Sequence, residues 1–205
     1  MMNKIIKNTL ILTAITVVSG CLLGLVYEVT KAPIAAAQEA AKQEAYRIVL
    51  EEAQDFVVDE AFNAADAAAL LSDAGISGTD IDEVVIAKDA SGEVLGYVIT
   101  TTSHEGYGGD IKVSTGIFSD GTVKGIEMLS IGETAGLGMK ATEDDFKDQF
   151  KDKLVELFTV TKSGSSNDSE IDALSGATIT SNAVTNAVNS ALVYYQNMLG
   201  GSVSE

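Results

Sequence analysis

The most apolar part of the chain is an uncharged run from residue 9 to residue 27. Lys4 and Lys7 precede this run, and Glu28 and Lys31 follow it. About 19 residues form a helix roughly 28 Å long, which is close to the thickness of the hydrocarbon core of a bilayer. The pattern therefore predicts a transmembrane anchor helix over residues 9–27.

The charges around this run predict its orientation. Basic residues stay on the cytoplasmic side, so residues 1–8 are expected in the cytoplasm and the acidic remainder outside, on a single-pass protein of the cell (inner) membrane. A cleaved signal peptide would need a small-residue cleavage site after a shorter apolar core. Val18-Ser19-Gly20-Cys21 fits a lipobox, although the chain stays apolar over residues 22–26, where a lipoprotein usually turns polar. Lipidation of Cys21 therefore stays open, and either reading tethers the protein to a membrane.

Two alanine-rich stretches follow the anchor. Residues 34–55 are rich in Ala, Gln and Glu, which favour helix, but their apolar positions form only a thin stripe. Residues 59–77 are a second, partly helical stretch. We interpret the whole segment 28–78 as a helical stalk or linker.

The pattern becomes β-like at the start of the predicted domain, residues 79–200. Alternating and β-branched positions, separated by turn residues, predict strands and hairpins. The expected strands are 83–87 and 93–102 around a turn at 89–92, and 111–118 and 122–129 around Ser119-Asp120-Gly121.

The last third of the chain returns to helical spacing. Residues 143–156 are expected to form a helix that buries Phe146, Phe150, Leu154 and Leu157, and residues 158–161 a strand. A final helix carries an apolar face from Ala183 to Tyr195, with Thr180 and Ser181 as candidate N-caps, and residues 201–205 form a tail. The order of elements predicts an α+β fold: a largely antiparallel sheet with flanking helices, behind a transmembrane helix.

Composition limits the functions available to this domain. The formal net charge is −17 and the isoelectric point is near 4.2, which argues against binding nucleic acid. A single cysteine excludes an internal disulfide, a cysteine-based zinc site and an iron–sulfur cluster held by this chain alone. His104 is the only histidine, which excludes a histidine-rich metal site. We interpret His104, beside a glycine-rich turn, as a solvated side chain.

The most informative segment is residues 172–181, Asp-Ala-Leu-Ser-Gly-Ala-Thr-Ile-Thr-Ser. By its residues alone it is a small-residue turn that leads into a helix, and Gly176 suits a tight loop because it tolerates positive φ. The positive end of a helix dipole and its free N–H groups favour a phosphate at that position. A capped core helix with no ligand is the plainer interpretation.

The longer pattern closely resembles the flavinylation motif of the FMN-binding domain family. This family includes the G subunits of Rnf electron-transport complexes and the C subunits of sodium-pumping NADH:quinone reductases. The resemblance implies that FMN is joined to Thr178 by a phosphoester bond, next to Ser175, Gly176 and Ala177. It also implies a flavin transferase that uses FAD and recognises Asp172.

Two further segments are similar to segments of this family. Residues 106–111, Gly-Tyr-Gly-Gly-Asp-Ile, include Tyr107, and residues 133–138 read Glu-Thr-Ala-Gly-Leu-Gly. The resemblance implies that the second loop lies against the isoalloxazine ring; the contacts it implies are Tyr107, Thr134, Leu137 and Gly138, with Glu133 holding the loop in place. The family often has Pro at the position of Ala135 and His at that of Ile131, so the fine tuning of the flavin is expected to differ.

The three segments occur in the order found in Rnf G subunits. The resemblance implies an electron-transfer subunit of a ferredoxin:NAD oxidoreductase complex coupled to export of Na⁺ or H⁺, with other membrane and cytoplasmic subunits as partners. The residues offer no set of catalytic acid, base and nucleophile. Two alternatives stay open: a stand-alone tethered flavoprotein that feeds an extracellular reductase, and a non-redox surface lipoprotein.

Overall fold

The computed structural model describes residues 2–200, so the predicted tail at 201–205 lies outside the described residues. The chain divides into two compact units, Met1–Lys42 and Gln43–Glu205. Helix α1 (Met2–Val49) begins in the first unit and ends in the second.

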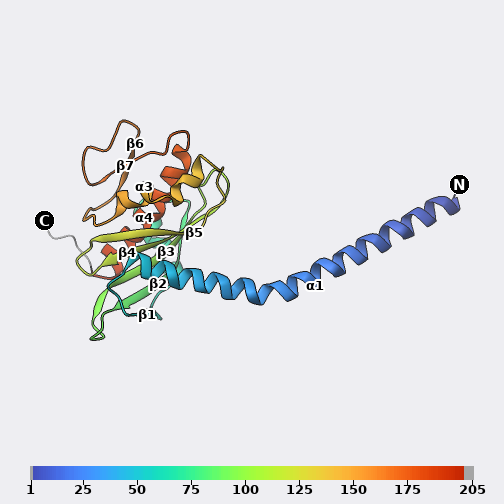
Figure 1. Cartoon of the computed structure of the whole chain (residues 1–205), viewed down its shortest axis with the longest axis horizontal. Coiled ribbons are helices and arrows are strands. Elements are labelled where there is room, and N and C mark those ends of the chain that lie inside the picture. Colours follow the sequence, from blue (N-terminus) through green and yellow to red (C-terminus); the bar gives the residue numbers. More distant parts are fainter. Residues whose placement is uncertain (1, 201–205) are drawn as a thin grey trace. The chain divides into compact units, whose positions relative to one another are not determined.

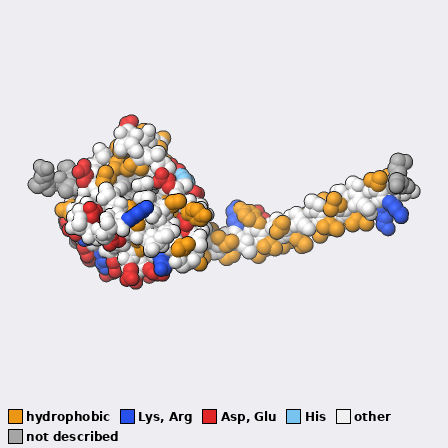
Figure 2. All heavy atoms as spheres, turned by 90° about the horizontal axis from the view of Figure 1, so that it is seen from above, with side chains coloured by type: hydrophobic (Ala, Val, Ile, Leu, Met, Phe, Trp, Pro, Cys, Tyr) orange, Lys and Arg blue, Asp and Glu red, His pale blue; other side chains and the backbone are white. Residues whose placement is uncertain are grey.

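The first unit consists of the N-terminal part of α1. The most apolar 18-residue window of this helix has a mean hydropathy of 2.3, and none of the window is buried in the protein. Figure 2 shows hydrophobic side chains along most of the helix and basic side chains close to its N-terminal end. By length and composition the helix can cross a membrane, as the apolar run predicted. It continues through Pro33 despite the hydrogen bond that a proline removes, so the predicted anchor and the start of the stalk are one element.

The second unit is built on a five-stranded antiparallel sheet in which the strands follow the chain in order, β1-β2-β3-β4-β5 (Figure 1). Every neighbouring pair is antiparallel, so short turns connect β2 to β3 and β4 to β5. The four predicted strands are confirmed as β2 to β5, of which only β2 is longer than expected, and β1 was not predicted. Their bounds are β1 Asp55–Val58, β2 Thr79–Lys88, β3 Val94–Ser103, β4 Ile111–Phe118 and β5 Val123–Ser130.

Each face of the sheet is covered by a different helix. Helix α4 (Thr178–Met198) contacts β2, β3 and β4, and residues of its predicted apolar face are buried, among them Val184, Val188 and Leu192. The last turns of α1 cover the other face, where Tyr46, Val49 and Leu50 pack against Val85 and Val98. Burying both faces gives the α+β domain that the sequence predicted.

Glycine lets α1 lie directly on the sheet. A β-carbon added to Gly116 of β4 would lie 2.4 Å from the backbone oxygen of Val49 and 2.9 Å from its carbonyl carbon. Such distances are not found between real atoms, so only glycine fits between this strand and the end of α1. The close approach buries Val49 and Leu50 completely or almost completely.

The compact unit reaches further towards the N-terminus than residue 79. Strand β1 and helix α2 (Ala64–Asp73) fall in the segment that the sequence assigned to a stalk or linker, yet they belong to the unit that starts at Gln43. Asn63 caps α2 by accepting the Ala65 N–H at 2.9 Å, and Leu71 of this helix is buried in the main core. Because the apolar positions of these segments form only a thin stripe, the sequence did not predict that they pack in the domain.

The predicted helix at 143–156 is largely wrong. A 3₁₀ turn η1 (Gly138–Thr142) precedes the segment, which itself forms a short helix α3 (Asp144–Lys147) and a second 3₁₀ turn η2 (Asp148–Phe150). Asp152 then adopts a φ of 55°, and the backbone of Lys153 pairs with that of Val123 at 2.8 and 3.1 Å. This pairing with the sheet ends the helical path.

Burial follows the same division. Phe146 and Phe150 are buried, as predicted, whereas Leu154 and Leu157 lie beyond the helical part and are 51% and 41% exposed. The chain then forms two short parallel strands, β6 (Thr159–Thr161) and β7 (Glu170–Asp172), which lead directly into the turn before α4.

The glycine contact generates a stability prediction. Gly116→Ala should lower the free energy of unfolding by about 1–3 kcal/mol, because the added methyl group overpacks a rigid backbone contact. The matched control is Gly125→Ala on β5, where the added carbon would meet only the Val49 Cα, at 4.0 Å. Urea unfolding of both variants in detergent measures the difference. Equal stability of the two variants would contradict the close approach of α1 to β4.

Candidate functional site

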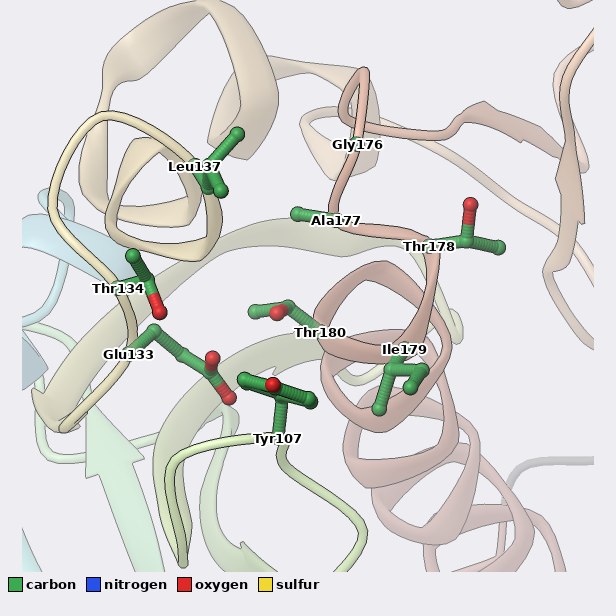
Figure 3. Close-up of a pocket in the computed structure, with 9 residues that line it drawn as sticks. All are labelled: Tyr107, Glu133, Thr134, Leu137, Gly176, Ala177, Thr178, Ile179 and Thr180. Carbon is green, nitrogen blue, oxygen red and sulfur yellow. The ribbon is translucent and has the colours of Figure 1, made fainter.

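One cavity of about 610 Å³ brings together three segments that are far apart in the sequence (Figure 3). They are the loop between β3 and β4, the loop after β5, and the start of α4. The lining residues are Tyr107, Glu133, Thr134, Leu137, Gly176, Ala177, Thr178, Ile179 and Thr180. A volume of this size is in the range of cofactor and ligand sites, roughly 300–1,000 Å³.

The start of α4 differs from the prediction. The helix begins at Thr178 with Ala177 as its N-cap, whereas Thr180 and Ser181 were expected to cap it. Both are buried inside the helix instead. The Ser181 hydroxyl accepts the Leu174 N–H at 2.9 Å and donates to the Ala177 carbonyl at 3.0 Å, so it holds the preceding turn closed.

This arrangement leaves backbone donors at the helix start. The first N–H groups of any helix have no partner within the helix, and among the described residues no side chain caps those of α4. With the positive end of the helix dipole, they form an environment that favours an anionic group such as a phosphate.

The turn before α4 has the shape that the sequence predicted. Gly176 has a φ of 75°, a conformation that other residues resist, and the Ala177 N–H bonds the Leu174 carbonyl at 3.0 Å. A β-carbon on Gly176 would lie 3.2 Å from Leu137 Cδ2, so the turn almost touches the opposite wall. Ser175 is exposed and does not line the cavity.

Thr178 lies at the edge of the cavity. It is half-buried, and in Figure 3 its side chain extends away from Leu137 and Thr134, with the hydroxyl oxygen on the outer side. A hydroxyl in this position can be reached from outside, while the backbone of the same residue still lines the cavity.

Asp172, predicted as the residue that a transferase recognises, is the last residue of β7 and does not line the cavity. Gln149 holds its backbone on both sides: its Oε1 accepts the Asp172 N–H at 2.6 Å, and its Nε2 donates to the Asp172 carbonyl at 3.4 Å. The start of the motif is therefore fixed to η2.

Glu133 joins two of the three segments. It is buried, and its Oε1 accepts the Gly108 N–H from the loop between β3 and β4 at 3.2 Å. Gly138 lies behind the wall rather than in it. A β-carbon there would be 2.6 Å from Thr180 Oγ1 and 2.8 Å from Glu133 Cβ, so glycine lets the loop pack directly on α4.

The rim of the cavity is apolar. Tyr107 is 73% exposed, Ile179 is 54% exposed and Leu137 is 43% exposed. Exposed apolar side chains around a cavity suit a flat aromatic ligand that is only partly covered. Tyr107 and Leu137 were predicted from the sequence, whereas Ile179 was not, because its only signal is its place within the motif, directly after Thr178.

His104 is not simply solvated, as the sequence interpretation had it. Its Nε2 lies 3.0 Å from Asp80 Oδ2 and its Nδ1 lies 2.9 Å from Asp110 Oδ1. The hydrogen bond to Asp80, followed by that to Asp110, raises the pKa of His104 from 6.5 to about 8. The ring does not line the cavity, but it sits at the base of the loop that carries Tyr107.

Comparison with known protein families gives two matches. The model of the FMN-binding domain matches residues 106–193, a range that contains every lining residue of the cavity. A model described as the RnfG N-terminal region matches residues 1–49, which correspond to α1.

Similar proteins extend over nearly the whole chain. The G subunit of the Na⁺-translocating ferredoxin:NAD⁺ oxidoreductase complex of Acetobacterium woodii is 39% identical, over 95% of this chain and 93% of its own. The G subunit of the ion-translocating oxidoreductase complex of Methanosarcina acetivorans is 33% identical, over 94% and 95%. The G subunit of the proton-translocating ferredoxin:NAD⁺ oxidoreductase complex of Clostridium ljungdahlii is 31% identical, over 97% and 96%.

The fold also occurs in a solved structure. The C subunit of the Na⁺-translocating NADH-quinone reductase from Parabacteroides distasonis covers 82% of this chain and 96% of its own, with a TM-score of 0.56 and 20% identity. The two proteins share the fold.

The contact between the loop and α4 generates a second prediction. Gly138→Ala should destabilise the protein by about 1–3 kcal/mol, because the new methyl group must push Thr180 and Glu133 apart. Gly132→Ala in the same loop is the control, since its β-carbon would meet only the Gly108 oxygen, at 3.8 Å. Thermal unfolding of the unmodified protein checks both. A stable Gly138→Ala variant would show that the two walls are not in direct contact.

Proposed function

Because the chain belongs to the family of G subunits of ion-translocating oxidoreductase complexes of the Rnf type, we propose that it is a membrane-anchored FMN carrier. In this role it relays electrons within a ferredoxin:NAD oxidoreductase complex that moves ions across the membrane. The observation that carries the proposal is the cavity at the start of α4, whose walls come from the three segments that resemble the FMN-binding family.

The residues of the cavity fit FMN. The apolar side chains of Tyr107, Leu137 and Ile179 suit the faces of the isoalloxazine ring, and the uncapped start of α4 suits its phosphate. Bound FMN supplies one- and two-electron transfer. The chain's own part is to position and retain the cofactor, which explains why it needs no catalytic acid or base.

Thr178 is the residue to which we assign the covalent bond. Its hydroxyl lies at the outer edge of the cavity, in the first residue of α4, next to the helix donors that favour a phosphate. A flavin transferase would move the FMN moiety of FAD to Thr178 Oγ, with AMP as the leaving group and loss of the hydroxyl proton. Asp172, fixed by Gln149, is the residue that this enzyme recognises.

The other subunits of the complex supply the remaining chemistry. Ferredoxin, NAD and the transported ion are all handled by partner subunits in this proposal. The names of the relatives differ in the ion, Na⁺ in Acetobacterium woodii and the proton in Clostridium ljungdahlii.

The proposed topology places residues 1–8 in the cytoplasm, one membrane span in α1, and the flavin domain outside. Lys4 and Lys7 on the N-terminal side of the apolar run support this orientation. A cofactor outside the cytoplasm would be lost on dissociation, which favours a covalent bond. Similarity over 95% of the chain to a complex subunit does not favour a stand-alone flavoprotein or a non-redox lipoprotein.

The attachment site is tested by substitution. Thr178→Ala should abolish covalent flavin because no other atom replaces the hydroxyl oxygen, whereas Thr178→Ser should retain it. Flavin fluorescence of the denatured protein on a gel, after co-expression with the transferase, and the mass of the intact chain measure the modification. A fluorescent band in Thr178→Ala would place the bond on another residue.

The topology is tested with protease. Added to intact spheroplasts, it should digest the domain that follows α1 and leave a tag at the N-terminus intact. Lysed spheroplasts are the control, in which both parts should be cut. Full protection of the domain in intact spheroplasts would put it in the cytoplasm and overturn the proposed orientation.

A further inference from the structure

The loop over residues 104–110 carries Tyr107 into the cavity wall. It connects β3 to β4, whose ends are neighbours in the sheet, since Ser103 pairs with Ile111. The backbone of the loop is compact: a β-carbon on Gly106 would lie 2.2 Å from the Gly109 oxygen. The position of Tyr107 therefore depends on how the two ends of this loop are held.

The His104 ring holds both ends of the loop. Nδ1 reaches Asp110 at the far end of the same loop, and Nε2 reaches Asp80 on β2. The backbone N–H of His104 also donates to the Gly78 carbonyl at 2.8 Å, so residue and ring are fixed to the segment before β2. Only a ring that carries a proton on each nitrogen can donate to both carboxylates.

The middle of the loop has two further attachments. Gly108 donates its N–H to Glu133, on the opposite side of the cavity. Glu105 accepts from Asn186 Nδ2 of α4 at 2.6 Å. Tyr107 lies between these attachments, so the two contacts and the ring at the base of the loop together determine the placement of this cavity wall.

We propose that His104 is a positioning residue for the cofactor cavity: its doubly protonated ring fixes the loop that carries Tyr107, so the placement of this wall follows pH. The proposal rests on the proposed function only for the identity of the ligand. The link between the ring and the loop stands on the unmodified protein.

The charges around the ring determine the direction of the pH dependence. The charged groups of this surface patch are Asp80 and Asp82 on β2, Lys112 on β4 and Asp110 at the end of the loop. Glu105, the next residue in sequence after His104, bonds Asn186 of α4. Asp82 is engaged elsewhere, by Lys112 at 3.3 Å and by the Thr102 hydroxyl at 2.6 Å. The ring therefore faces Asp80 and Asp110.

The sign follows from the raised pKa. His104 has a pKa of about 8 in the folded protein against an ordinary value of 6.5. Its contribution to stability is complete below the ordinary value and is lost as the pH rises through about 8. Above that pH the neutral ring has one N–H, so one of the two carboxylates faces a lone pair, and the ring no longer bridges Asp110 of the loop and Asp80 of β2.

The test uses the full chain with Thr178→Ala in detergent micelles, so that it does not depend on flavin. His104 is the only histidine, so its ring signals in a ¹H–¹³C NMR titration need no assignment. We expect a pKa of about 8, a return towards 6.5 in Asp110→Asn, and amide signals of Gly106, Gly108 and Gly109 that titrate with the midpoint of the ring.

The control is Asp82→Asn, which removes the same charge from the same patch without a contact to the ring. Asp82→Asn should lower the pKa of His104 less than Asp110→Asn does. The amide signals of Gly106, Gly108 and Gly109 should keep their wild-type chemical shifts. Loop amide shifts that do not change with the protonation of the ring would overturn the proposal. Equal shifts of the His104 pKa in the two variants would overturn it as well.

A second readout uses the flavin-loaded wild-type chain. Its flavin emission should change between about pH 6.5 and pH 9 with the midpoint of the His104 ring, because Tyr107 lies at the cofactor cavity. His104→Gln cannot titrate in this range and should flatten the change. Emission that is independent of pH in the loaded wild type would count against the proposal, even if the attachment to Thr178 is confirmed.

Discussion

The docking of α4 on the sheet is the interaction on which the site depends. The buried face of this helix fills the core, and polar bonds fix its position along the sheet: the Thr101 hydroxyl donates to the Ala187 carbonyl at 3.1 Å, and the Thr79 and Ser190 hydroxyls lie 2.7 Å apart. Asn189 bonds both backbone groups of Phe158, at 2.8 and 2.9 Å. These bonds place the start of α4 beside the two loops at the end of the sheet, so core packing and the cavity are set together.

Two polar side chains then fix the loop between β3 and β4 at the cavity. Glu133 reaches across the cavity to the loop that carries Tyr107, and His104 closes the base of that loop. One anchor is buried and the other is exposed. A buried carboxylate that accepts a backbone N–H gives a fixed contact, whereas an exposed histidine between two carboxylates can change its proton count near neutral pH. The same loop thus has a buried attachment at Glu133 and an exposed one at His104.

The sequence predicted strands β2 to β5 and most cavity residues because both have local signals: alternation with turn residues, and short motifs. It did not predict the end of the helix at 143–156, since the pairing of Lys153 with Val123 joins residues 30 positions apart. The start of α4 was also misplaced, because Ser181 looks like a cap in sequence but bonds the turn that precedes the helix. For His104, Asp80 becomes a partner only through the register of β2 and β3, which pairs Thr79 with Ser103.

The exposed rim explains why the residues that position the cofactor need not be the residue that retains it. Tyr107, Leu137 and Ile179 all keep much of their surface in solvent, so a ligand against them leaves part of itself uncovered. Burial of apolar area contributes about 25 cal/mol per Å², and an open site therefore supplies little affinity from this source. An open site is nevertheless useful for electron exchange, because a partner can approach the ring. A phosphoester at Thr178, outside the apolar walls, would retain the cofactor without closing the cavity.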